Sequence, residues 1–205
     1  MRKLWIVILT MLMAFGAFGC GSEDGKAEEK AVPAANAQQA KTADTKGKIL
    51  VAYFSATGNT KTLAETTAKA LGADLYEIKP EQPYTAQDLN YNDETTRATV
   101  EQKDDKARPP LADKNAKIAD YETIVLAYPI WWGQAPRIMD TFVESYDFSG
   151  KKMTAICTSG GSDIGSSADY LEKLTKGKAE WKQGRLFSPQ ASAEEVKSWF
   201  TGLGF

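Results

Sequence analysis

A hydroxyl- and glycine-rich turn follows the first apolar, strand-like segment of the chain. The apolar segment spans residues 48–54, and a helical pattern continues from Lys61. The turn between them consists of Ser55, Ala56, Thr57, Gly58, Asn59 and Thr60. Backbone N–H groups converge at the N-terminus of a helix and the helix dipole adds partial positive charge, so such a turn can bind phosphate without a charged side chain. The competing interpretation is an ordinary turn between a strand and a helix.

Two later loops also follow apolar segments and carry different chemistry. The first contains two adjacent tryptophans and consists of Tyr128, Pro129, Ile130, Trp131, Trp132 and Gly133. The second contains hydroxyl groups and paired glycines and consists of Thr158, Ser159, Gly160 and Gly161. We expect at least one tryptophan to be exposed, because neighbouring side chains at a strand end point in opposite directions.

The elements that position these loops are predicted from the apolar pattern. Predicted strands cover residues 48–54, 75–79, 123–127, 152–158 and 180–187. Predicted helices cover residues 59–71 and 166–174, and two more begin near Gln134 and Ser192. This alternation predicts an α/β fold with a parallel sheet covered on both faces. The carboxyl ends of parallel strands share one edge, so the loops would form a pocket for a planar aromatic ring that carries a phosphate.

Each of these features also has a simpler explanation. The tryptophans could form a protein–protein contact, and the glycines could only relieve a tight turn. Residues 80–120 are polar, with at most one helix in residues 94–103, and they form either a solvated crossover or part of the site. Cys157 is expected to be a small buried hydrophobic residue.

Composition excludes several classes of function. The chain has no histidine, which removes a Ser-His-Asp triad, a Cys-His dyad and imidazole metal ligands. Its formal charge of −2 does not favour nucleic acid. Neither a G-x-G-x-x-G motif nor a glycine-rich loop ending in G-K-[ST] is present. We therefore predict no catalytic acid–base or nucleophile set and no metal site.

The N-terminus has the pattern of an export signal. Arg2 and Lys3 precede an apolar stretch over residues 4–18, which is too short to span a membrane. Cys20 follows small residues and resembles the lipidated cysteine of bacterial lipoproteins; ordinary secretion with cleavage nearby is the alternative. We predict a signal peptide in residues 1–19, a lipidated Cys20 with a flexible linker in residues 20–47, and a folded domain in residues 48–205. The protein would then be exported and attached to the bacterial cell membrane by its lipid.

The three loops, in this order, resemble those of the flavodoxin family. The resemblance covers about residues 48–203 and implies a five-stranded sheet of order 2-1-3-4-5 that binds one FMN without a covalent bond. It implies that the phosphate is held by Ser55, Thr57, Gly58, Asn59 and Thr60. It also implies that Trp131 or Trp132 packs against the isoalloxazine ring, and that backbone around residues 159–161 contacts the pyrimidine edge. Main-chain atoms near Gly133 would lie close to flavin N5.

Residues 158–165 depart from the family pattern because they contain no aromatic side chain. One face of the flavin is therefore expected to be open to a substrate, or covered by Tyr84 or Tyr91. The leading interpretation is an FMN electron-transfer protein whose partner is a redox protein or a small-molecule acceptor. The alternative is an FMN-dependent NAD(P)H oxidoreductase that reduces a quinone or nitro compound, and a lesser one is an anchored binding module without flavin.

Overall fold

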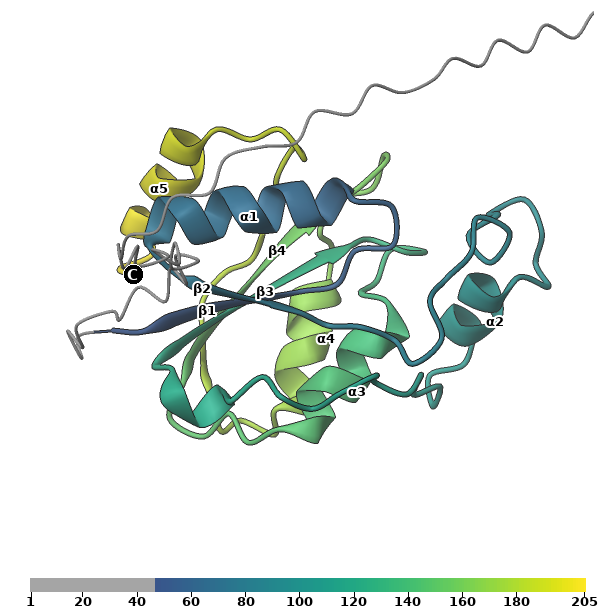
Figure 1. Ribbon diagram of the computed structural model, residues 1–205, viewed down its shortest axis with the longest axis horizontal. Helices are drawn as coiled ribbons and strands as arrows, with labels where there is room; N and C mark the ends of the chain where they lie inside the picture. Colours follow the sequence, from purple (N-terminus) through teal and green to yellow (C-terminus); the bar gives the residue numbers. More distant parts are fainter. Residues whose placement is uncertain (1–46) are drawn as a thin grey trace, which may run out of the picture. The chain divides into compact units, whose positions relative to one another are not determined.

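Parallel strands form the sheet in the computed structural model, which describes residues 47–205 (Figure 1). The four longer strands are β1 (Ile49–Tyr53), β2 (Asp74–Glu77), β3 (Thr123–Pro129) and β4 (Lys152–Thr158). The strand order is β2-β1-β3-β4-β5, with β2 at one edge, as predicted. In register, Val51 lies beside Leu75 of β2 and Val125 of β3. The carboxyl ends of β1 and β3 are thus neighbours although β2 separates them in sequence.

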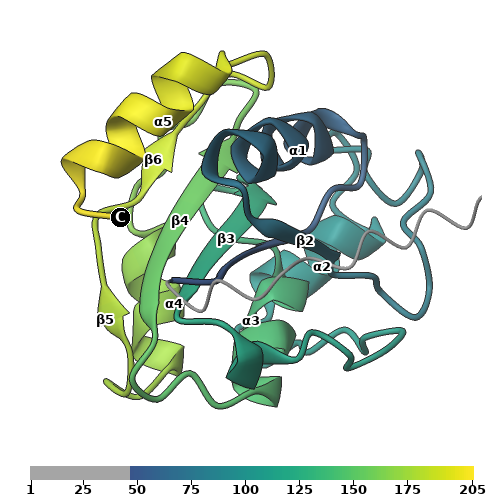
Figure 2. The same ribbon diagram turned by 60° about the vertical axis from the view of Figure 1, so that its left-hand side comes forward.

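Helices cover both faces of the sheet (Figures 1 and 2). The helices are α1 (Asn59–Leu71), α2 (Arg97–Lys103), α3 (Arg137–Ser145), α4 (Ser167–Leu174) and α5 (Ala193–Gly202), and a short 3₁₀ helix spans Ile118–Asp120. In Figure 1, α1 and α5 lie above the sheet, while α3 and α4 lie below it. The α2 helix lies near the end of the domain where β1, β3 and β4 finish.

Alternation along the strands divides the core into two layers. On β1, Leu50 and Ala52 belong to the layer that includes Phe142 of α3. Val51 belongs to the opposite layer, with Leu63 of α1. The central strands are therefore buried on both faces, as expected of a parallel sheet between helices.

The predicted strand over residues 180–187 is not continuous. Two short strands, β5 (Glu180–Trp181) and β6 (Arg185–Leu186), each pair with β4 (Figure 2). Between them the Thr154 hydroxyl donates to the Gln183 carbonyl at 2.9 Å. A Cβ on Gly184 would lie 3.0 Å from the Ala155 carbonyl, so glycine allows the close approach that interrupts the strand.

The N-terminal predictions lie outside the described residues. They are the signal peptide over residues 1–19, the lipidated Cys20 and nearly all of the linker. Within residues 47–205, no helix has the length and apolar character needed to cross a membrane.

Candidate functional site

The three loops predicted from the sequence meet at the carboxyl edge of the sheet and surround a cavity of about 250 Å³. It is lined by Thr57, Asn59, Leu89, Tyr91, Pro129, Ile130, Trp131, Thr158, Ser159 and Gly160. Eight of these ten residues are among the predicted site residues, and they come from all three loops. The other two, Leu89 and Tyr91, come from the long connection between β2 and β3.

The turn after β1 offers backbone donors to a ligand. Gly58 adopts a φ of 92°, and its N–H donates to Ser55 Oγ at 3.1 Å. The N–H of Thr62 bonds to the Gly58 carbonyl, so the N–H groups of residues 59–61 precede the first helical hydrogen bond. No side chain caps this helix and no acidic residue lies in its first turn. These donors fit an anion such as phosphate.

Thr60 has a second role that the sequence did not reveal. Its side chain is buried, and its hydroxyl pairs with Thr158 Oγ1 at 2.8 Å. The Ile130 N–H donates to the Thr158 carbonyl at 2.8 Å. Thr158 therefore links all three loops, and the Thr60 hydroxyl serves this link while its N–H remains at the start of α1.

The two tryptophans point in opposite directions, which confirms that at least one is exposed. Trp131 is 4% exposed and packs edge-on against Phe54 and Tyr84, with ring centroids 5.5 and 5.1 Å apart. Trp132 is 40% exposed, so of the two tryptophans it is the one that presents its ring to solvent. Tyr128, another predicted contact, is buried in the core, where its hydroxyl pairs with Ser167 at 3.0 Å. The Tyr128 side chain is thus structural.

Trp132 occupies a strained position. The N–H groups of Trp131 and Gln134 each donate to the other's carbonyl, at 2.9 and 3.0 Å. Both residues inside this turn have positive φ, 47° for Trp132 and 73° for Gly133, as in a type I′ turn. A bulky side chain is unfavourable at φ > 0, and such strain occurs mostly at functional sites. The same turn delays α3, which begins at Arg137 and not near Gln134 as predicted.

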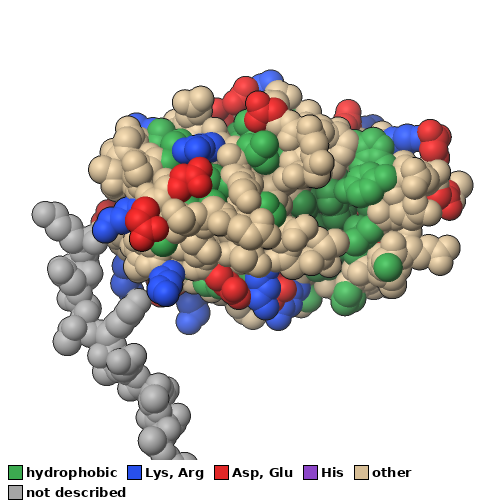
Figure 3. Space-filling view, turned by 90° about the horizontal axis from the view of Figure 1, so that it is seen from above, with side chains coloured by type: hydrophobic (Ala, Val, Ile, Leu, Met, Phe, Trp, Pro, Cys, Tyr) green, Lys and Arg blue, Asp and Glu red, His purple; other side chains and the backbone are tan. Residues whose placement is uncertain are grey.

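Tyr91 lies against this exposed tryptophan. The Tyr91 and Trp132 rings are 4.2 Å apart at their centroids, with 32° between their planes. Tyr84 was the other candidate to cover the flavin, but its ring packs against Phe54 and lies under the Arg97 guanidinium at 4.1 Å. Figure 3 shows apolar side chains gathered at the right, the side on which α2 lies in Figure 1.

The glycine loop leaves backbone open at the cavity. Ser159 Oγ accepts from the N–H groups of Gly161 and Ser162 at 3.2 and 2.8 Å. A Cβ on Gly160 or Gly161 would meet nothing within 4 Å, and neither residue has a φ in the left-handed region. Neither packing nor turn geometry therefore requires glycine here. The remaining reason for glycine is that a ligand approaches the backbone closely.

A buried ionic cluster fastens the long connection behind the site. Arg137 is buried, donates from Nη1 to Asp140 at 3.3 Å and from Nη2 to the Gln102 carbonyl at 3.0 Å, and pairs with Asp105. Gln102 in turn donates to the Ala135 carbonyl at 2.9 Å. Burial raises the pKa of Asp140 to about 6, although Arg108 and Arg137 lower it. The only sequence signal for this cluster is a pair of charged residues, Arg137 and Asp140, on the apolar part of α3.

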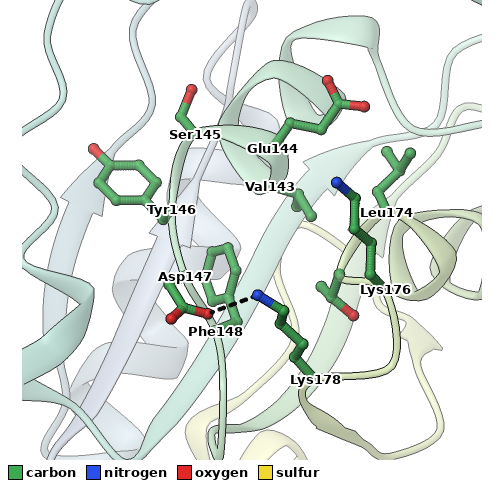
Figure 4. A pocket seen from close by; sticks show the side chains of 10 residues that line it. Val143, Glu144, Ser145, Tyr146, Asp147, Phe148, Leu174, Lys176 and Lys178 are labelled. Atoms are coloured by element: carbon green, nitrogen blue, oxygen red, sulfur yellow. Dashed lines mark ion pairs between the residues drawn. The ribbon is translucent and has the colours of Figure 1, made fainter.

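Two predicted residues and two further cavities lie apart from this cavity. Ser55 and Ala56 line a neighbouring cavity of about 450 Å³ on the β2 side of the turn. Another cavity, of about 260 Å³, is lined by the C-terminal ends of α3 and α4 and the loops after them, at the opposite edge of the sheet (Figure 4). Lys178 points toward Asp147 there, 3.9 Å away, and none of the predicted site residues lines it.

Cysteine and metal chemistry find no support in the part of the chain that the structure describes. Cys157 is buried, as predicted, and burial raises the pKa of its thiol to about 12, so the thiol stays protonated and unreactive. Residues 47–205 contain no cluster of acidic and cysteine side chains that could hold a metal ion.

Comparisons with known proteins agree with this geometry. The sequence profile of a family described as flavodoxin matches residues 48–203. A crystallised candidate flavoprotein from Bacteroides eggerthii DSM 20697 is 44% identical, with a TM-score of 0.74; the match covers 78% of this chain and 99% of that one. A second, from Bacteroides uniformis ATCC 8492, is 46% identical with a TM-score of 0.70, and the match covers 76% of this chain and 98% of that one.

More distant structures share the fold alone. A flavoprotein from Lactobacillus acidophilus NCFM, crystallised in complex with FMN, is 19% identical with a TM-score of 0.57, and the match covers 75% of this chain and 99% of that one. No curated protein sequence matches the chain.

Proposed function

Because the chain belongs to the flavodoxin family, we propose that it uses FMN to pass electrons between partners while tethered to a membrane. FMN is the cofactor of this family, and sheets of this strand order hold it at the switch point between β1 and β3. The cavity described above lies at that point. Its donors fit the phosphate of FMN, and the exposed Trp132 ring in the loop beside it fits the flavin ring.

One end of the site would bind the phosphate of FMN and the other end would bind its ring. The N–H groups of residues 59–61, with the Thr57 hydroxyl and Asn59 amide, would hold the phosphate. Trp132 and the backbone of Ser159 and Gly160 would hold the ring. When bound, FMN supplies one- and two-electron chemistry, and the protein positions it and excludes water from one side.

The observation that carries the electron-transfer proposal is the chemistry of the cavity lining. Among the ten lining residues, only Tyr91 can titrate, and burial raises its pKa, so it stays protonated at neutral pH. The lining therefore offers a substrate no general base or general acid that works at neutral pH, and so no group that would activate one of its hydroxyls as a nucleophile. Electron transfer needs none of these groups; it needs a flavin edge that a partner can approach.

Reductive titration of the FMN-loaded protein tests this proposal. A carrier is expected to take up electrons in two resolved one-electron steps and to oxidise NAD(P)H slowly. Rapid NAD(P)H oxidation with a quinone or nitro compound as acceptor would contradict the carrier function. A protein that purifies colourless and does not bind added FMN would contradict both.

An FMN-dependent NAD(P)H oxidoreductase is the second candidate. Hydride transfer to a flavin needs a second planar ring to stack beside it. The loop after β4 supports this candidate, because Gly160 and Gly161 are exposed and no aromatic side chain of that loop covers the site.

Attachment to a membrane is the remaining part of the proposal, and it rests on the sequence of residues 1–20. Cys20→Ala would remove the lipidated thiol. We expect the full-length protein to move from the membrane fraction to the soluble fraction when this change is made. Retention of the variant in the membrane fraction would contradict lipid anchoring through Cys20.

A further inference from the structure

We propose that Tyr91 is a second aromatic contact of the flavin ring, paired with Trp132. This inference rests on FMN as the cofactor and deepens the proposed function. It assigns to the connection between β2 and β3 a role that the loop after β4, which has no aromatic side chain, does not fill.

The first support is where Tyr91 lies. The described part of the chain exposes four large apolar side chains, Leu75, Tyr91, Val100 and Trp132. Two of these four, Tyr91 and Trp132, contact each other, with ring centroids 4.2 Å apart. Tyr91 also lines the cavity, although it is 52% exposed. Two rings that remain half open to water beside a ligand cavity form a surface that a third ring can cover.

The second support is that the segment carrying Tyr91 is held in place. Gln102 on α2 donates to the carbonyl of Ala135, three residues after Trp132, and Arg137 binds the Gln102 carbonyl at 3.0 Å. The Ala98 N–H donates to the Asp88 carbonyl at 3.1 Å, which fastens the turn before Tyr91 to α2. Tyr91 is therefore presented to the cavity by a fixed element, and little conformational entropy is lost when it contacts a ligand.

The third support is that local hydrogen bonds order the turns that carry Tyr91. Residues 90–96 form short turns closed by local hydrogen bonds, such as Asn92 N–H to Asn90 Oδ1 at 3.1 Å and Asp93 N–H to the Asn90 carbonyl at 3.2 Å. The paired Tyr91 and Trp132 rings remain 52% and 40% exposed, which is the surface that a planar ring can cover. Tyr84 cannot take this part, since its hydroxyl donates to Glu101 and Arg97 lies over its ring.

The test compares flavin binding by Tyr91→Ala, Tyr91→Phe and the wild type. The matched control is Val100→Ala, which removes an equally exposed apolar side chain of the same segment that does not line the cavity. Dissociation constants are measured for FMN and for riboflavin, together with the fluorescence of each bound flavin and the urea midpoint of the apoprotein.

We expect Tyr91→Ala to weaken FMN and riboflavin by the same factor, about two- to tenfold for the loss of one aromatic pair. The fluorescence of the bound flavin should rise, because a stacked tyrosine quenches it. Tyr91→Phe should keep most of the affinity, since it keeps the ring, and Val100→Ala should match the wild type.

Other results would overturn the inference. A Tyr91→Ala variant with a lower urea midpoint but unchanged flavin affinity and fluorescence would show that Tyr91 only packs against Trp132. Loss of FMN affinity alone, with riboflavin unaffected, would place Tyr91 at the phosphate instead. If the wild type binds no FMN, the cofactor assignment itself fails, which is a distinct outcome.

Discussion

Asp140 should make the protein more stable in mild acid than at neutral pH. Its side chain is fully buried on α3, and Oδ2 accepts from Arg137 at 3.3 Å and lies 3.5 Å from Arg108. Its other oxygen, Oδ1, has no hydrogen-bond partner among the described residues. Burial of this incompletely paired carboxylate raises its pKa to about 6. The change to test is Asp140→Asn.

The size and sign of the effect follow from the two pKa values. An unfolded aspartate has a pKa of about 3.9, so the folded value is about two units higher, and each unit corresponds to about 1.4 kcal/mol. The folded state takes up the proton first as the pH falls. The free energy of unfolding should therefore rise by about 2 kcal/mol as the pH falls from 7 to 4, most of it between pH 6 and 4.5, and it reaches the full gain of about 3 kcal/mol only below the unfolded pKa.

Few other groups change their protonation in the pH range in which Asp140 titrates. The chain has no histidine to titrate near pH 6. Several carboxylates have a lowered pKa, including Asp88, Asp93 and Asp147, each held by hydrogen bonds to a nearby Thr or Ser. Their contribution is lost only as the pH falls below their ordinary value of 3.8.

Urea denaturation at pH 7, 6 and 5 measures the effect. The wild type should gain stability across this series, and Asp140→Asn should be nearly flat. Asp147→Asn is the control, because that exposed carboxylate titrates below the range and should leave the slope unchanged. Equal slopes for the wild type and Asp140→Asn would refute the assignment of the raised pKa to this residue.

Three further changes probe the site itself. Thr57→Ala should weaken FMN several-fold and leave riboflavin unchanged in a binding titration, because Thr57 faces the cavity at the phosphate turn; equal loss for both would contradict its assignment. Thr60→Val should lower the free energy of unfolding by about 1–3 kcal/mol in urea, because it leaves the buried Thr158 hydroxyl without its partner; no change would contradict the link between loops. Trp132→Asn should keep or raise stability, since Asn tolerates positive φ, yet weaken both flavins; a less stable protein with unchanged binding would contradict the strain at this residue.

The sequence was sufficient to predict the elements that depend on local pattern. The buried strands read as apolar runs, so β1, β3 and β4 and the loops after them were located correctly. The order of the strands, however, came from the family resemblance, because alternation alone does not say which strand lies beside which. Exposure of one tryptophan followed from alternation at a strand end, but which one is exposed depends on the turn that places Trp132 at positive φ.

Contacts between distant polar residues were not predictable. The hydrogen bond of Gln102 to Ala135 and that of Thr60 to Thr158 join residues 33 and 98 positions apart, and polar side chains give no periodic signal. The break between β5 and β6 depends on how closely Gly184 approaches its neighbours, which composition does not show. Leu89 was missed for a similar reason: one apolar residue in a polar stretch indicates no partner.

The residues that lead into α3 connect Trp132 with the segment that carries Tyr91. The turn that exposes Trp132 ends at Gln134. The carbonyl of Ala135 accepts a hydrogen bond from the Gln102 side chain, and Arg137 donates to the Gln102 carbonyl of α2. Residues 80–120 are mostly polar and place only a few apolar side chains against the core, and the buried polar contacts at Ala135 and Arg137 add to these in holding the segment. Residues 134–137, which lead into α3, therefore fix both Trp132 and the segment that carries Tyr91. A change there would alter both aromatic contacts at once, while the phosphate turn, linked through Thr60 and Thr158, would keep its geometry.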